Sequence, residues 1–217
     1  MSQSMKMDIR IPINSGALEG ELVIPDGAKG IVFFAHGSGS SRFSPRNRQV
    51  ASALNEAGMG TLLFDLLTEE EDSVYETRFD IGLLTDRLVL AHRWLRQLPE
   101  VSGLGVGFFG ASTGAAAALM AAADIGPDIR AVVSRGGRPD LAEPKLHLVK
   151  SPTLLIVGGN DEPVIGMNES ALAGLKCEKK LVIVPGATHL FEEPGTLEKV
   201  SELAIGWFEG HLGPGPS

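Results

Sequence analysis

The chain has 217 residues, of which 27 are glycine, about 12% against a typical usage near 7%. Hydrophobic residues make up 43% and charged residues 21%, which are ordinary values for globular domains and argue against disorder and against a coiled coil. Nineteen Lys and Arg against 27 Asp and Glu give a formal net charge of -8, which disfavours nucleic acid and anionic membranes as partners.

Cysteine usage and segment hydrophobicity bear on location and domain organisation. The one cysteine, Cys177, excludes an intrachain disulfide, and the opening MSQSMKMDIR has no apolar stretch typical of a secretory signal. No window reaches the roughly 18 apolar residues of a membrane span, so we expect a cytoplasmic protein. Without an internal repeat or linker, the sequence predicts one domain over residues 1–212 and a disordered tail over 213–217.

Short β-branched runs alternate with longer helical patterns along the chain. This alternation predicts an α/β fold with a mostly parallel sheet covered by helices. The first two runs precede any helical pattern, so they should form an antiparallel hairpin at one edge. Strands are predicted at residues 9–13, 18–24, 30–35, 61–66, 105–109, 130–134, 153–157 and 181–184.

Helical periodicity is clearest over residues 78–98, where six apolar residues recur at steps of three and four. This stripe leaves His92 on the exposed side of the helix. Further helices are predicted at residues 45–57, 114–123, 164–175 and 196–211. The segment 68–77 carries five carboxylates without the defined spacing of a cation site, so we expect a solvated loop there.

A G-x-S-x-G motif occupies residues 110–114, between the strand-like LGVGFFG and the helix-like TGAAAALMAAA. A tight strand-to-helix turn holds its serine in strained backbone geometry and needs small neighbours. The hydroxyl of Ser112 is then exposed at the carboxyl end of the sheet. We therefore predict Ser112 to be a catalytic nucleophile.

A serine nucleophile requires a histidine base and a carboxylate that orients the base. In the chain order Ser, acid, His, Asp161 follows the strand-like PTLLIVG and His189 follows KKLVIVP. Glu162 and Asp140 are the alternative acids, but Asp161 lies in the tighter loop after its strand. His189 is predicted as the base because no other histidine follows a strand in the last third of the chain.

The other histidines and one aspartate have simpler interpretations. His92, His147 and His211 are interpreted as surface residues. His36 ends the third predicted strand and should fix the geometry of the loop HGSGSS through hydrogen bonds. Asp65 ends the fourth and should brace the loops around the site.

Attack on a carbonyl develops negative charge on its oxygen, which preorganised N–H donors stabilise. The backbone N–H of Thr113, directly after the nucleophile, is one predicted donor. The second should come from the loop after the third strand, where Ser38 is favoured by position. Gly37 and Gly39 on either side of Ser38 allow close approach of the backbone.

Together, HGSGSS, GASTG, GGNDEPV and GATHLFEEPG resemble the small dienelactone-hydrolase-like branch of the α/β-hydrolases from about residue 30 to 211. The resemblance implies an eight-stranded sheet with helices on both faces and the triad Ser112, Asp161 and His189. Dienelactone hydrolases proper use a cysteine nucleophile, whereas this chain has a serine. Only residues 135–151 separate the sixth strand from the acid-bearing strand, which is too short for a sizeable cap, so the site should be open.

Six arginines fall in the loops at the predicted active-site end: Arg42, Arg46, Arg48, Arg78, Arg135 and Arg138. The simpler interpretation is that several pair with the acidic segment 69–72. The alternative is that a guanidinium group binds a substrate carboxylate. Arg135, directly after its strand, is the best candidate for substrate contact, so we hypothesise a preference for esters that bear a carboxylate.

These patterns predict a serine esterase that cleaves small carboxylic esters through an acyl-enzyme, with no metal and no organic cofactor. Its activity should rise with pH as a histidine base loses its proton, near the usual histidine range of about 6.5. The alternatives are a thioesterase, a hydrolase of peptide-like substrates or of dienelactone-type lactones, and a non-catalytic small-molecule-binding protein. A small-molecule ester is the expected partner, and the oligomeric state stays open between monomer and homodimer.

Overall fold

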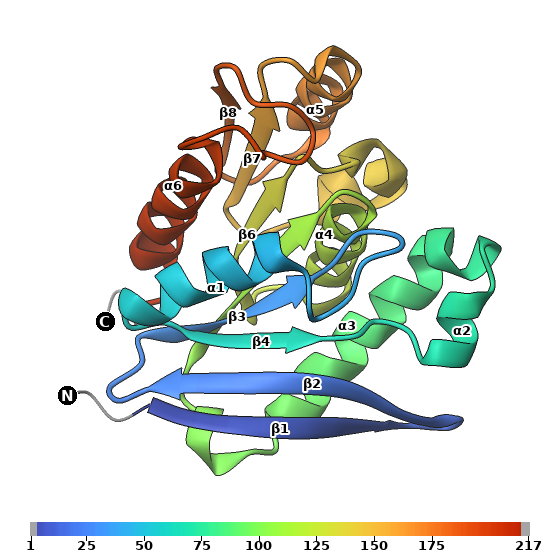
Figure 1. Cartoon of the computed structure of the whole chain (residues 1–217), viewed down its shortest axis with the longest axis vertical. Helices are drawn as coiled ribbons and strands as arrows, with labels where there is room; N and C mark the ends of the chain where they lie inside the picture. The colour runs from blue at the N-terminus through green and yellow to red at the C-terminus, as the bar shows by residue number, and fades with distance from the viewer. Residues whose placement is uncertain (1–3, 214–217) are drawn as a thin grey trace.

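The computed structural model describes residues 4–213, and eight strands form one sheet in the order β1-β2-β4-β3-β5-β6-β7-β8 (Figure 1). Among the described strands, only the pairs β1–β2 and β2–β4 are antiparallel. The predicted hairpin at one edge and the mostly parallel sheet are therefore confirmed. The strands are β1 (Ser4–Ile13), β2 (Gly16–Pro25), β3 (Gly30–Ala35), β4 (Gly60–Phe64), β5 (Gly105–Ala111), β6 (Ile129–Arg135), β7 (Thr153–Gly158) and β8 (Lys179–Val184). Of the tail predicted to be disordered, residues 214–217 lie outside the described residues.

Helices cover both faces of the sheet, as predicted. On one face, α1 (Pro45–Glu56) and α6 (Thr196–His211) enclose an apolar cluster; on the other, α3 (Ile81–Leu95), α4 (Thr113–Ile125) and α5 (Glu162–Gly174) enclose a second one (Figure 1). Between β6 and β7 lies only the 3₁₀ helix η3 (Pro139–Leu148), so the expected lack of a sizeable cap is confirmed. None of the described helices is long and apolar enough to cross a membrane.

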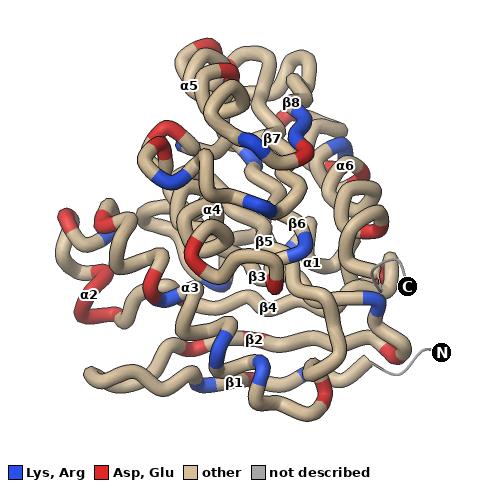
Figure 2. Tube along the Cα trace, turned by 180° about the vertical axis from the view of Figure 1, so that it is seen from behind, with Lys and Arg blue, Asp and Glu red and all other residues tan. Residues whose placement is uncertain are grey.

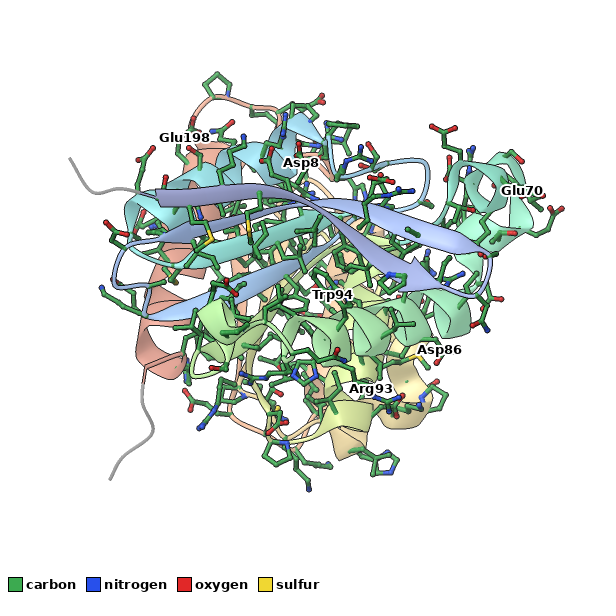
Figure 3. All side chains as sticks on the ribbon, turned by 90° about the horizontal axis from the view of Figure 1, so that it is seen from below. Asp8, Glu70, Asp86, Arg93, Trp94 and Glu198 are labelled. Carbon is green, nitrogen blue, oxygen red and sulfur yellow. The ribbon has the colours of Figure 1, made fainter. Side chains whose placement is uncertain are left out.

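Helix α3 is shorter than the predicted span of residues 78–98. It begins where the Asp80 carboxylate caps it by accepting a hydrogen bond from the Leu83 N–H at 2.9 Å. Figure 3 shows Asp86 and Arg93 on the side of α3 that faces away from the sheet. The expectation that His92 is exposed is wrong: its exposed fraction is 5%, because it lies one turn after the buried Leu88 and widens the apolar stripe.

The acidic segment is not a plain loop, so that expectation is also wrong. It forms the short helix α2 (Glu69–Ser73), which Figure 2 shows as a cluster of acidic positions. A capping box starts this helix: the Thr68 hydroxyl accepts from the Glu71 N–H, and the Glu71 carboxylate accepts from the Thr68 N–H. The capping box explains why so acidic a segment is helical, because carboxylates stabilise the positive end of a helix. A 3₁₀ helix, η1 (Glu76–Phe79), then leads towards α3.

Close packing between β5 and α4 determines the turn that joins them. A Cβ on Gly110 would overlap the Ala115 backbone, and a Cβ on Gly114 would overlap the carbonyl oxygen of Ala35 in β3. The four alanines that follow, residues 115–118, are fully buried. Only residues without a large side chain allow α4 to approach the sheet this closely, and this approach places the α4 N-terminus at the carboxyl end of β5.

Candidate active site

Ser112 lies in the turn between β5 and α4, with φ 51° and ψ -123°, one of two described non-glycine residues with positive φ. Its carbonyl accepts hydrogen bonds from the N–H groups of Ala115 at 3.1 Å and Arg138 at 3.0 Å. These contacts hold a backbone conformation that is unfavourable for a residue with a side chain. The residue therefore has the local geometry expected of the serine in a strand-to-helix nucleophile turn.

Asp161 and His189 meet across the loops that follow β7 and β8. The Nδ1 atom of His189 lies 2.7 Å from the Oδ2 atom of Asp161. The Asp161 side chain is 13% exposed, whereas that of His189 is 39% exposed. Because an ionised carboxylate only accepts hydrogen bonds, Nδ1 is the donating nitrogen and Nε2 remains free to accept a proton.

Direct hydrogen bonds join the two loops that carry this pair. The N–H of Asn160 donates to the Ala187 carbonyl at 2.9 Å, and its side-chain amide donates to the Gly186 carbonyl at 3.0 Å. Gly158 packs so closely on Ala187 that a Cβ would overlap the latter's carbonyl oxygen. The acid and the base are thus held on one connected backbone unit.

A second contact closes the loop that carries His189. The Thr188 hydroxyl donates to the Glu193 carboxylate at 2.6 Å, and the Thr188 N–H donates to it at 3.1 Å. These hydrogen bonds from Thr188 lower the pKa of Glu193. Phe191 lies between Thr188 and Glu193 in the sequence and has φ 56°. Its side chain is buried and packs in the apolar core, which anchors this turn.

The alternative acids lie elsewhere. Asp140 binds Arg138, with Oδ2 at 2.8 Å from Nη2. Glu162 is the first residue of α5 and is exposed. Of the three candidate acids, Asp161 is the one that contacts His189 within the described residues.

The loop after β3 lies against the nucleophile turn. The Ser38 N–H donates to the Thr113 hydroxyl oxygen at 2.9 Å. A Cβ on Gly37 would come within 3.1 Å of the Ser112 Cβ, which explains the glycine at that position. The two predicted oxyanion residues, Ser38 and Thr113, are therefore neighbours. The Thr113 hydroxyl oxygen accepts a hydrogen bond from the Ser38 N–H.

His36 and Asp65 form hydrogen bonds that hold the loop after β3, as the sequence predicted. The Nε2 atom of His36 accepts from the Leu66 N–H at 3.0 Å, so Nδ1 carries the ring proton and donates to the Gly37 carbonyl at 3.0 Å. Burial lowers the pKa of His36, which keeps the ring neutral. The Asp65 carboxylate accepts from the Arg42 N–H at 2.7 Å and forms an ion pair with the Arg42 guanidinium.

Ser112 and His189 line a common cavity of ≈ 260 Å³. Its other lining residues are Gly37, Ser38, Ser40, Ser44, Arg46, Asn47, Ala111, Arg135 and Leu190. A larger cavity of ≈ 450 Å³ is lined by His36, Ser40 and Ser41, among others, shares Ser40 with the first, and does not include Ser112. We take the smaller cavity as the candidate active site, because it contains the nucleophile and the base.

Five of the six arginines at this end of the sheet pair with carboxylates: Arg42 with Asp65, Arg46 with Glu192, Arg48 with Glu21, Arg78 with Asp72, and Arg138 with Asp140. Only Arg78 among them pairs with the segment 69–72, so the expectation that several do so is wrong. Arg135 is 6% exposed and has no carboxylate partner within the described residues. Its Nη2 donates to the Oδ1 of Asn47 at 3.2 Å.

Asn47 is a site residue that the sequence interpretation missed. It is 2% exposed and lines the cavity from the first turn of α1. It continues the buried stripe of Val50, Ala51 and Leu54 in α1. A polar residue on the core-facing stripe of a predicted helix was the available signal, because buried polar groups require partners.

Comparison with known proteins identifies the family. The profile of the dienelactone hydrolase family matches residues 18–205. A dienelactone hydrolase from Anabaena variabilis ATCC 29413 is 57% identical over 97% of this chain and 99% of that chain, with a TM-score of 0.94. Est1E from Butyrivibrio proteoclasticus shares the fold at a TM-score of 0.81 and 17% identity, covering 94% of this chain and 98% of that chain.

A Mycobacterium tuberculosis (strain ATCC 25618 / H37Rv) protein that carries the name of a phosphoribosyl transferase is 56% identical over 97% of this chain. The match covers 48% of that relative, so the chain spans about half the length of this curated relative. Sequence, sheet topology and the strand-to-helix turn around Ser112 lead to the same assignment. The chain belongs to the dienelactone hydrolase family and has the α/β-hydrolase fold.

Proposed function

We propose that this protein is a serine hydrolase that cleaves small carboxylic esters through an acyl-enzyme intermediate. The observation that carries the proposal is the 2.7 Å contact of His189 with Asp161 beside a cavity that both His189 and Ser112 line. Such a set converts a weakly nucleophilic hydroxyl into an effective one, because the imidazole accepts its proton as the bond to the carbonyl carbon forms.

In the first half-reaction, Ser112 Oγ attacks the ester carbonyl and its proton passes to His189 Nε2. The carboxylate of Asp161 accepts the Nδ1–H and stabilises the imidazolium. Collapse of the tetrahedral intermediate breaks the bond to the alcohol oxygen, which leaves with the proton from His189. Water then attacks the acyl-enzyme with His189 as base, and the acid and Ser112 are released.

Two backbone N–H groups are the proposed oxyanion donors. The Thr113 N–H lies in the first turn of α4, at its positive end. The Ser38 N–H donates to the Thr113 hydroxyl in the free protein, so we expect the oxyanion to share it or replace that hydroxyl. Arg135 is the proposed contact for the substrate, because it lines the same cavity.

The serine at position 112 favours esters over the lactones that cysteine-dependent family members cleave. Thioesters share the tetrahedral chemistry and are the second candidate class. The name of the Mycobacterium tuberculosis relative belongs to a protein about twice as long as the matched segment. The family profile covers residues 18–205 of this chain, so we propose hydrolase chemistry for the matched segment.

The proposal is tested with a fluorophosphonate probe, which reacts covalently with activated serines. We expect the wild-type protein to be labelled at Ser112, identified by peptide mass spectrometry, and to hydrolyse 4-nitrophenyl acetate. Ser112→Ala should abolish both, and His189→Ala should reduce each at least a thousandfold, in line with triad residues that act as a unit.

Ser170→Ala is the matched control, since Ser170 lies on α5 and does not line the cavity. It should be labelled as the wild type is. Labelling that survives in Ser112→Ala would refute Ser112 as the nucleophile. A wild-type protein that neither reacts with the probe nor turns over any ester or thioester would refute a serine hydrolase, and the binding-protein alternative would then stand.

A further inference from the structure

The cavity beside Ser112 has a cationic end. Arg135 closes it from the last position of β6, 6% exposed, and its Nε is buried without a hydrogen-bond partner. Its Nη2 contacts the neutral amide oxygen of Asn47 at 3.2 Å. A buried guanidinium without an anion is costly, because burial removes its hydration and, within the described residues, the neutral Asn47 amide replaces only part of it.

Arg46 adds a second cation to the same wall. Its side chain lines the cavity, its Nε is also buried without a partner, and its Nη1 is 3.0 Å from the Glu192 carboxylate. Glu192 is 63% exposed, so water screens its charge. The cavity is therefore lined by two arginines, and the carboxylate that pairs with Arg46 lies outside its lining and faces solvent.

The N-terminus of α1 converges on this point. Ser44 caps the helix, with its hydroxyl accepting from the Asn47 N–H at 3.3 Å, and both residues line the cavity. Pro45 has no N–H and the Asn47 N–H is capped, so this terminus contributes mainly the partial positive charge of the helix dipole. An anion is therefore the ligand favoured here, because the α1 N-terminus, Arg46 and Arg135 all carry positive charge.

The charge of Arg135 persists at neutral pH. Burial and the nearby Arg46 lower the pKa of Arg135 to about 10, which leaves its guanidinium protonated at pH 7. Its planar donor groups match the two oxygens of a carboxylate, and an ester whose carbonyl contacts Ser112 would place a short acyl chain within the ≈ 260 Å³ cavity.

We propose that Arg135, with Arg46 and the α1 N-terminus, forms a subsite for a carboxylate at the far end of the acyl group, so that the preferred substrates are monoesters of short dicarboxylic acids. This inference rests on the proposed function and specifies its substrate class. Asn47 is a positioning residue, because its amide oxygen orients the guanidinium. The hydrolysis itself consumes water and releases the free dicarboxylate and the alcohol.

The test compares kcat/KM for monomethyl glutarate and methyl hexanoate, followed by acid release in a pH-stat. We expect the wild-type protein to favour the charged ester at least tenfold. Arg135→Gln should reduce that preference about ten- to hundredfold, because hydrogen bonds to charged groups are lost. Arg135→Lys should recover part of it, since the charge remains but the planar donor pair does not.

Arg48→Gln is the matched control, because Arg48 is paired with Glu21 and does not line the cavity. It should keep the wild-type preference. The subsite would be overturned if the ratio of kcat/KM for the charged ester to that for the neutral ester were the same in the wild type and in Arg135→Gln. If turnover of the neutral ester still depended on Ser112, the proposed function would remain intact.

A binding measurement separates the two proposals further. Isothermal titration of the Ser112→Ala variant with glutarate should show one site, weakened at least tenfold by the added Arg135→Gln substitution. Inorganic phosphate serves as the competing anion: tighter binding of phosphate than of glutarate at the same site would overturn the carboxylate assignment. Absence of any anion binding would overturn the subsite itself, whatever the outcome of the probe labelling at Ser112.

Discussion

At the scale of single residues, Thr113 contributes two different groups to the site. Its backbone N–H is a proposed oxyanion donor, and its hydroxyl oxygen accepts the Ser38 N–H at 2.9 Å. This hydrogen bond is the direct link between the nucleophile turn and the loop after β3. Thr113 is therefore a positioning residue for the second oxyanion donor.

Thr113→Val should lower kcat for 4-nitrophenyl acetate about five- to tenfold with little change in KM, because a hydrogen bond worth about 1 kcal/mol no longer holds Ser38 in place. Thr113→Ser keeps the acceptor and should restore kcat. Steady-state kinetics of both variants check this, alongside thermal melting. A Thr113→Val enzyme with the wild-type kcat would show that the contact does not position the loop.

The sequence predicted those site residues whose chemistry is tied to a position in the chain. Ser112 has a motif, Asp161 and His189 each follow a strand, and the structure brings the last two within hydrogen-bond distance. Asn47 was marked in the sequence only as a polar residue on a core-facing helix stripe, and the hydroxyl of Thr113 had no signal, because the roles of both depend on what packs opposite them. Arg135 was singled out by position, but its lack of a carboxylate partner required the packed structure.

At the scale of elements, the unit formed by β5, the turn and α4 determines where the nucleophile lies. Gly114 permits the α4 N-terminus to contact β3, where a Cβ would overlap the Ala35 carbonyl oxygen. The overlap involves backbone on both sides, so no side-chain rotation relieves it. The position of α4 against the sheet thus depends on a single missing methyl group.

Gly114→Ala should destabilise the fold by about 1–3 kcal/mol, the usual cost of overpacking, and should reduce esterase activity as the turn shifts. Gly206→Ala is the control: this exposed position in α6 has nothing within 4 Å of an added Cβ, and the substitution should stabilise by up to about 1 kcal/mol. Urea unfolding measures both. A Gly114→Ala protein as stable as the wild type would contradict the packing argument.

Long periodic elements were predicted well, and the errors have local causes. The stripe in α3 was identified, but its width was underestimated, so His92 was assigned to the surface although it packs 6.5 Å from the Phe33 ring centre. Helix α2 was missed because charge dominated the interpretation, whereas two hydrogen bonds of a capping box decide its conformation. Both errors arise where a short-range contact outweighs the average character of a segment.

At the scale of the whole molecule, two buried histidines make folding sensitive to acid. Burial lowers the pKa of His36, and burial together with Arg96 lowers that of His92. The unfolded chain therefore takes up protons first as the pH falls below about 6.5. The stabilisation is fully present above that pH and is lost as the pH falls through the folded-state pKa values.

The free energy of unfolding should decrease by up to about 1.4 kcal/mol per pH unit for each histidine within that window. His92→Leu should flatten the dependence, whereas His147→Gln at an exposed position should leave it unchanged. Urea unfolding between pH 5 and 8 measures the slope. An identical slope in His92→Leu and wild type would assign the acid sensitivity to other groups.

The antiparallel hairpin at the sheet edge also shapes a cavity next to the candidate active site. Because β2 runs against the parallel strands, its first residues lie beside their carboxyl ends, and Ala17 and Glu19 form one wall of the ≈ 450 Å³ cavity. No hairpin residue lines the cavity of Ser112. Substitutions at Ala17 or Glu19 can therefore reshape the ≈ 450 Å³ cavity without altering any residue that lines the cavity of Ser112.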